Sequence, residues 1–137
     1  ADRERLDALA HSLGVADRVH FLGELSTAQM GLFLAALDCF VFPSATETFG
    51  LAPVEAAQAG VPVVANDLEV LREVLSVDGE PCALFVGARD TSCFAAAVPT
   101  IDQTVYEAIA WLRSLVERFP LDAMIDEYLK LMEPQRA

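Results

Sequence analysis

Short apolar runs alternate with longer helical patterns along this chain, and this alternation restricts the fold more than any other feature of the sequence. The clearest run is residues 38–43, which is apolar in its middle and is stopped by Pro43. Residues 62–65 form a second run without polar side chains. Such runs are typical of parallel strands that are covered on both faces. The pattern therefore predicts an α/β fold, with a Rossmann-like parallel sheet flanked by helices.

Read along the chain, the same patterns predict four strands, at residues 19–22, 38–43, 62–65 and 83–86. Helices are expected at residues 3–13, 27–37, 51–59, 68–75, 90–98, 103–119 and 121–133, so the C-terminal third is wholly helical. Gly14 is expected to end the first helix, Ser26 or Thr27 to cap the second, and residues 78–81 to form a loop. No linker or shift in composition divides the chain, so residues 1–137 are expected to form one domain.

The formal net charge of −12 argues against nucleic acid and against an anionic membrane as partners. No apolar run reaches about 18 residues, and no basic-then-apolar leader is visible, so neither a transmembrane helix nor a secretory signal is expected. Cys39, Cys82 and Cys93 match no metal or redox spacing, which indicates reduced thiols and a cytoplasmic protein. Cys39 is expected to be buried, and His11 and His20 to lie at the surface.

Ligands of open parallel sheets bind beyond the carboxyl ends of the strands, and residues 44–50 form such a loop. Gly50 stands directly before the helix at 51–59, whose first-turn amides and dipole favour an anion. Glu47 and Glu55 flank this turn, and a carboxylate can accept hydrogen bonds from two sugar hydroxyls. Each residue alone has an ordinary explanation: a turn glycine, a loop carboxylate, and a carboxylate in the first turn of a helix. Their combination is what predicts a binding site.

An ordered series of motifs carries a wider resemblance. It consists of residues 13–23, 38–44, 47–51 with Glu55, 60–65, 72–74 and 83–86. This series resembles the C-terminal domain of family-4 retaining glycosyltransferases, which have the GT-B fold. The resemblance covers nearly the whole chain in the family's order and spacing.

The resemblance implies that the chain is the half of such an enzyme that binds the nucleotide sugar. The enzyme would move a sugar from a nucleoside-diphosphate donor to an acceptor hydroxyl with retention of configuration. Glu47 matches the glutamate beside the donor sugar and its leaving phosphate, and is the implied catalytic residue. Glu55 matches the glutamate that holds the ribose hydroxyls. The donor contacts that the resemblance implies are, in full, Glu55, Thr48, Phe49, Gly50, Leu51, Gly23 and Leu22. The family's chemistry is metal-independent, so neither a metal nor a cofactor is expected.

Departures from the family also bear on function. Thr48 stands where glycine is commonest, and Glu69 replaces a proline. The chain begins at Ala1, after the segment that carries an Arg and a Lys for the diphosphate in the family. The resemblance therefore implies an N-terminally incomplete domain without its N-terminal acceptor domain. We therefore expect weak donor binding and no transferase activity of the chain alone. We also expect self-association through an open sheet edge.

Two other functions stay open. A non-catalytic interaction or assembly module would keep the fold without the chemistry. A nucleotide-sugar epimerase would need its own catalytic carboxylates and histidine, which the sequence does not place. The apolar stripe at residues 111–119 is expected to be a packing face, either within the domain or against the missing half.

Overall fold

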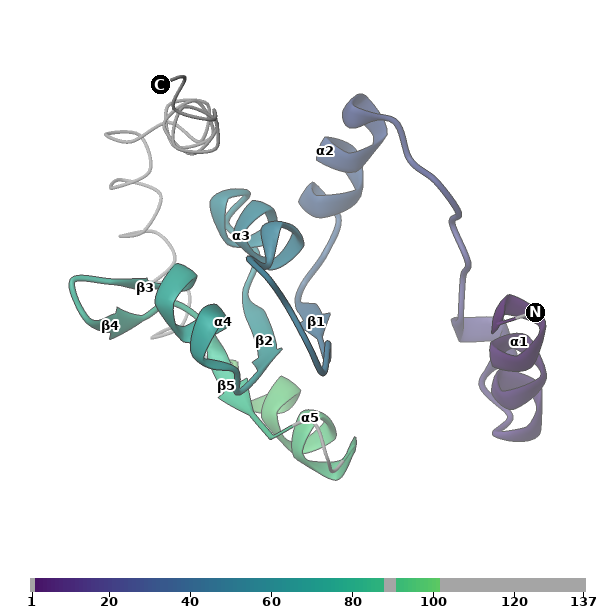
Figure 1. Cartoon of the computed structure of the whole chain (residues 1–137). Coiled ribbons are helices and arrows are strands. Elements are labelled where there is room, and N and C mark those ends of the chain that lie inside the picture. Colours follow the sequence, from purple (N-terminus) through teal and green to yellow (C-terminus); the bar gives the residue numbers. More distant parts are fainter. Residues whose placement is uncertain (1, 88–90, 102–137) are drawn as a thin grey trace, which may run out of the picture. The chain divides into compact units, whose positions relative to one another are not determined.

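The computed structural model of this protein describes residues 2–87 and 91–101 (Figure 1). The expected helices at 103–119 and 121–133, with the stripe at 111–119, lie outside the described residues. The chain separates into two compact units, Ala1–Leu32 and Phe33–Ala137. Each unit is built differently: the first holds helices, and the second holds the parallel sheet.

In the first unit, helix α1 (Asp2–Ser12) is followed by a 3-10 turn, η1 (Ala16–Arg18). The Gly14 N–H donates to the His11 carbonyl, and the Val15 N–H donates to the Ala10 carbonyl, both at 3.0 Å. This pair of bonds satisfies carbonyls that the end of a helix leaves unpaired. The prediction that Gly14 ends the first helix is therefore confirmed.

The strand predicted at residues 19–22 is wrong. The structure has no strand between η1 and α2, and Val19 and Leu22 are 39% and 54% exposed. A strand exists only through hydrogen bonds to a neighbouring strand, and the described residues of the first unit offer none. The apolar pattern was correctly recognised, but the pattern alone cannot supply a pairing partner.

Helix α2 (Thr27–Ala35) begins with a capping box. The Ser26 N–H donates to Gln29 Oε1 at 2.9 Å, and the Gln29 N–H donates to Ser26 Oγ at 3.4 Å. The two residues thus satisfy each other's amide groups at the start of the helix. Of the two expected caps, the structure selects Ser26.

The second unit contains a parallel three-stranded sheet in the order β1-β2-β5, made of β1 (Phe40–Phe42), β2 (Val63–Asn66) and β5 (Leu84–Val86). Figure 1 shows the three strands side by side. Val64 is opposite Val41 on one side and Leu84 on the other. The predicted α/β fold with a parallel sheet is confirmed.

Coverage of the sheet differs between its strands. Val63, Val64 and Ala65 of β2 are at most 1% exposed, as expected for a central strand. Val41 of β1 is 44% exposed, so full coverage of both faces was wrong for this strand. In the described structure β1 lies at the edge of the sheet, where one side has no neighbouring strand.

Helices join the strands. Helix α3 (Leu51–Gln58) packs against β1 and β2, and α5 (Thr91–Ala97), which continues into η2 (Val98–Thr100), packs against β5. Helix α3 ends at Gly60 in the same way as α1 ends, because the Val61 N–H donates to the Ala56 carbonyl at 3.0 Å. Helix α4 (Glu69–Val74) buries Leu71 completely. Among the described residues, no helix combines the length and apolar character that crossing a membrane requires.

Residues 78–81 are not wholly loop, as the sequence analysis expected. Strands β3 (Ser76–Val77) and β4 (Glu80–Pro81) pair antiparallel in a small hairpin. Asp78 and Gly79 form its turn, with φ of 51° and 84°. Asp-Gly is a preferred sequence for such two-residue turns, and this short-range signal was missed.

The three cysteines are free thiols, as expected, but their burial differs. Cys82 is buried and its thiol lies 3.6 Å from the Glu80 carbonyl oxygen, whereas Cys93 is exposed. Cys39 is half-buried and not buried, which corrects the expectation. Partial burial nevertheless raises the pKa of the Cys39 thiol, so this side chain is a poor nucleophile at neutral pH.

Leu71→Ala should destabilise the second unit by about 2–5 kcal/mol, because it opens a cavity under a helix whose core contact is this one side chain. Leu32→Ala is the matched control, since Leu32 is a helical leucine that is 74% exposed. Its expected effect is within about 0.5 kcal/mol. Urea unfolding followed by circular dichroism measures both, and equal effects would contradict the burial of Leu71.

Candidate functional site

Gly50 forms the turn between the loop at residues 44–50 and helix α3. It is buried and has a left-handed backbone, with φ of 84° and ψ of 49°. A Cβ atom at this position would lie 2.4 Å from Leu71 Cδ2, which is far inside contact distance. Both the backbone and the packing against α4 therefore favour glycine here.

The first turn of α3 presents main-chain amides at the carboxyl end of β1. The first bond within the helix runs from the Val54 N–H to the Gly50 carbonyl at 3.4 Å. The N–H groups of Leu51 and Ala52 precede that bond, while Pro53 has no N–H to offer. Two amides and the helix dipole thus give this turn a partial positive charge, which suits an anion.

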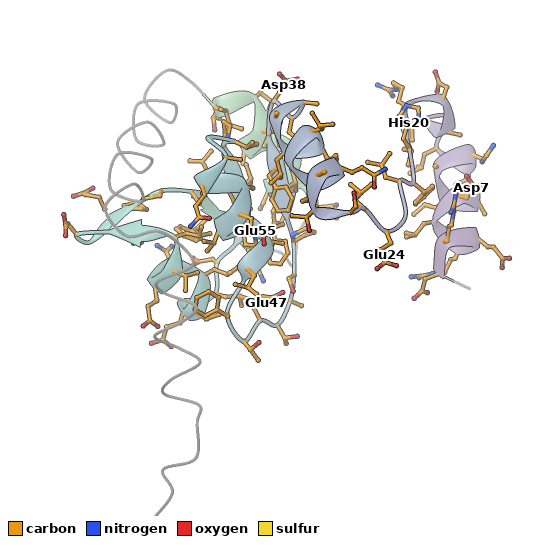
Figure 2. All side chains as sticks on the ribbon, turned by 90° about the horizontal axis from the view of Figure 1, so that it is seen from above. Asp7, His20, Glu24, Asp38, Glu47 and Glu55 are labelled. Atoms are coloured by element: carbon orange, nitrogen blue, oxygen red, sulfur yellow. The ribbon has the colours of Figure 1, made fainter. Side chains whose placement is uncertain are left out.

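The two glutamates of the motif lie on different elements, as Figure 2 shows. Glu47 is half-buried on the loop after β1, and Glu55 is exposed on α3. Glu55 is the fifth residue of this helix, so its expected place in the first turn was wrong. The helix dipole acts mainly within the first turn, which weakens the purely structural explanation for Glu55. Its carboxylate is accessible to a ligand.

The remaining predicted donor contacts divide between the two units. Thr48 and Leu51 are exposed and Phe49 is half-buried, all on the segment between the glutamates. Leu22 and Gly23 are exposed on residues that follow η1 in the first unit. The structure therefore brings Glu47 and residues 48–55 into one continuous strand-loop-helix unit. The contribution of Leu22 and Gly23 to donor binding stays a prediction.

A buried asparagine at the end of β2, which the sequence analysis did not single out, contacts this loop. Asn66 is 8% exposed, and its Nδ2 donates to the Ser44 carbonyl at 2.9 Å. Ser44 Oγ in turn donates to the Thr46 carbonyl at 2.9 Å. Asparagine directly after an apolar run was the available signal, because a polar side chain at a strand's carboxyl end lies where ligands and loops meet.

An ion pair follows Asn66 along the chain. Arg72 donates through Nε and Nη2 to the two carboxylate oxygens of Asp67, the second bond being 2.9 Å long. The guanidinium also lies 4.7 Å from the centre of the Phe85 ring. The hydrogen bond from Arg72 lowers the pKa of Asp67. Arg72 is the one Lys or Arg among the described residues of the second unit, and Asp67 already neutralises it.

The histidines lie at the surface, as expected. His11 and His20 are exposed, and His11 Nδ1 lies 2.9 Å from the Asp7 carbonyl. Within residues 2–87 and 91–101, no group of three or more His, Cys, Asp or Glu side chains is arranged to hold a metal ion. Metal-independent chemistry stays a prediction.

Gly50→Ala should destabilise the protein by more than about 1 kcal/mol, because a left-handed backbone and a contact with Leu71 both penalise the new methyl group. In a Leu71→Ala background the contact disappears, so Gly50→Ala should cost less there. Gly31→Ala is the control, since Gly31 lies within α2 with open space around it and alanine favours helix. Additive effects of the Gly50 and Leu71 substitutions in urea unfolding would contradict the contact.

The Asp67–Arg72 pair should make stability depend on acid. The folded-state pKa of Asp67 is lowered, so its contribution is fully present above about pH 4 and is lost as the pH falls through the lowered value. Asp67→Asn should therefore lower the Tm at neutral pH, and the difference from the unchanged protein should vanish in strong acid. Thermal unfolding at pH 2–7 tests this, and a difference that does not change with pH would contradict it.

Comparisons with known proteins place these features in a family. Residues 1–100 match the family described as "Glycosyl transferases group 1". The O-antigen chain mannosyltransferase RfbU of Salmonella typhimurium is 32% identical over 87% of this chain and 32% of its own length. The lipopolysaccharide core biosynthesis glycosyltransferase LpsE of Rhizobium meliloti is 35% identical over 96% of this chain and 38% of its own length. The phosphatidyl-myo-inositol mannosyltransferase of Mycobacterium leprae is 38% identical over 71% of this chain and 25% of its own.

The fold has a solved counterpart. The sucrose-phosphate synthase of Thermosynechococcus elongatus superimposes with a TM-score of 0.69 and 27% identity, over 96% of this chain and 34% of that protein. The chain thus spans between 25% and 38% of the length of these four proteins. Because the family match covers residues 1–100 and the parallel α/β fold agrees with that of a GT-B enzyme, this chain belongs to the group 1 glycosyltransferases.

Proposed function

We propose that this chain is the nucleotide-sugar-binding part of a retaining glycosyltransferase that transfers a sugar from a nucleoside-diphosphate donor to an acceptor hydroxyl. The observation that carries the proposal is the buried, left-handed Gly50 turn. It starts α3 at the carboxyl end of β1, between Glu47 and the exposed Glu55. Anion-binding amides and two carboxylates thereby occur within nine residues of continuous chain.

The diphosphate would bind at the amide groups of Leu51 and Ala52. A helix start can hold phosphate without a basic side chain, because its amides and dipole point at the ligand. Arg72 is a poor alternative ligand, since its guanidinium is engaged by Asp67 and Phe85. Two amides without a free cation would hold a diphosphate weakly, so other parts of a full-length enzyme would supply the cations.

Glu55 would bind the ribose. Its carboxylate is exposed on the second turn of α3, beyond the amides that would hold the phosphates. A carboxylate can accept hydrogen bonds from both vicinal hydroxyls of a ribose, and charge-assisted bonds are the stronger kind. The order along α3 is then phosphates at its start and ribose one turn later.

Glu47 would act at the sugar that is transferred. Transfer with an oxocarbenium-like transition state places positive charge on the sugar and negative charge on the leaving diphosphate. A carboxylate at Glu47 would stabilise the first, and the amides at the start of α3 would stabilise the second. Two of the four known proteins named above are called mannosyltransferases, so a mannosyl donor is the first candidate. The acceptor would bind to a separate N-terminal domain.

Calorimetric titration of GDP, UDP and ADP into the chain tests the proposed donor site. We expect weak binding of one nucleotide, and Glu55→Ala should weaken it about 10-fold or more, because a charge-assisted hydrogen bond is worth about 1.5–3 kcal/mol. Glu73→Ala is the matched control, since Glu73 is also an exposed helical glutamate but lies on α4. Its expected effect is less than twofold.

Two outcomes would count against the proposal. An equal loss in both variants would point to general electrostatics in place of a ribose contact. Absence of binding to the chain, and also to a full-length protein with its N-terminal part, would favour the non-catalytic module.

In the full-length protein, Glu47→Gln should lower kcat much more than it raises KM if Glu47 acts in the transition state.

A further inference from the structure

We propose that Asn66 is a positioning residue for the donor site: its side-chain amide, anchored at the end of β2, fixes the loop that carries Glu47. The functional part of this proposal rests on the proposed donor site. The structural part rests on contacts of Asn66, Ser44 and Leu71 that involve no ligand.

Asn66 lies at the carboxyl end of the central strand of the sheet. It is the last residue of the central strand, paired with Val86 of β5, and its carbonyl accepts the Leu68 N–H at 2.9 Å. The residue is 8% exposed. A buried amide is costly unless it is hydrogen-bonded, so the bond to the Ser44 carbonyl contributes to stability.

The bond reaches the loop at its beginning. Ser44 follows Pro43, two residues after the end of β1, and Asn66 Nδ2 holds its carbonyl at 2.9 Å. Ser44 Oγ then donates to the Thr46 carbonyl, and Glu47 is the next residue. Two consecutive hydrogen bonds therefore lead from the rigid end of β2 to the peptide group that joins Thr46 to Glu47.

The other end of the loop is held by the segment that follows β2. Leu71, on the helix that follows β2, packs against Gly50, where an added Cβ atom would force the Leu71 side chain to shift. Residues 66–71 thus fix both the beginning and the end of the loop at residues 44–50. A site that must hold a sugar and a diphosphate needs its groups held in place beforehand, and this connection provides that support.

Asparagine suits this role for a chemical reason. The contact requires a donor to reach a main-chain carbonyl from the adjacent strand. Aspartate of the same shape offers only acceptors when ionised, and serine is too short to span the same distance. Asn66→Asp and Asn66→Ser should both release the Ser44 carbonyl while leaving the residues of the proposed site unchanged.

Amide hydrogen exchange, resolved residue by residue by NMR, tests the structural part. In Asn66→Asp and Asn66→Ser, we expect the amides of residues 45–50 to exchange about 3- to 10-fold faster relative to those of β5, as loss of one hydrogen bond allows. Val64→Ala is the control for general destabilisation, since Val64 is fully buried two residues earlier on β2. This substitution should raise the amide exchange rates without a preference for residues 45–50. A loop response equal to that of Val64→Ala would overturn the proposal.

Titration with the nucleoside diphosphate that binds the unchanged chain tests the functional part. Both Asn66 variants should weaken binding about 3- to 10-fold at a temperature where they are fully folded, and Val64→Ala should stay within twofold. Selective loop exchange with unchanged affinity would reduce Asn66 to a structural residue and overturn the positioning role. If no nucleoside diphosphate binds the unchanged chain or a full-length protein, the proposed function fails and the positioning role falls with it.

Discussion

The hydrogen bond from Asn66 to the Ser44 carbonyl connects the core of this protein to its candidate site. The core includes β2, whose valines are excluded from water by strands on both sides and by α3. A strand in that position cannot shift without breaking hydrogen bonds to both neighbours. A segment that is bound to its carboxyl end is therefore held in place as well. The loop at residues 44–50 is held there at its beginning by the Asn66 hydrogen bond and at its end by packing against Leu71.

Electrostatics set the second constraint. The chain carries a formal net charge of −12, yet the site that we propose for it binds an anionic diphosphate. In the proposed site this conflict is limited locally. The charge that would face the ligand at the start of α3 comes from main-chain amides, whose positive character needs no basic side chain. The one described cation of the second unit, Arg72, instead stabilises the connection after β2 through Asp67 and Phe85. Affinity for a nucleotide sugar would then come from geometry more than from net charge.

The elements that the sequence predicted well share one property: their signal is local. Gly14 ends α1, Ser26 caps α2, the apolar run at residues 38–43 contains β1, and the run at 62–65 overlaps β2, which ends one residue later. Caps and helix ends are made by residues within about five positions of one another, so their partners can be read from the sequence. The motif from Glu47 to Glu55 is equally local, and the structure keeps it as one strand-loop-helix unit.

The sequence by itself determined the fold class, the boundaries of the five described α-helices to within two residues, and the segment that forms the candidate site, because hydrophobic period and turn residues act over short distances. Only the tertiary structure decided which apolar runs become strands, as residues 19–22 show, because a strand depends on a partner elsewhere in the chain. It also decided that Glu55 lies beyond the first turn of α3, and that Gly50 packs against Leu71, twenty-one residues later, where a side chain at position 50 would be penalised. The hydrogen bond between Asn66 and Ser44 could not be predicted from the sequence for the same reason. The two residues are twenty-two positions apart and meet only because β1 and β2 lie side by side.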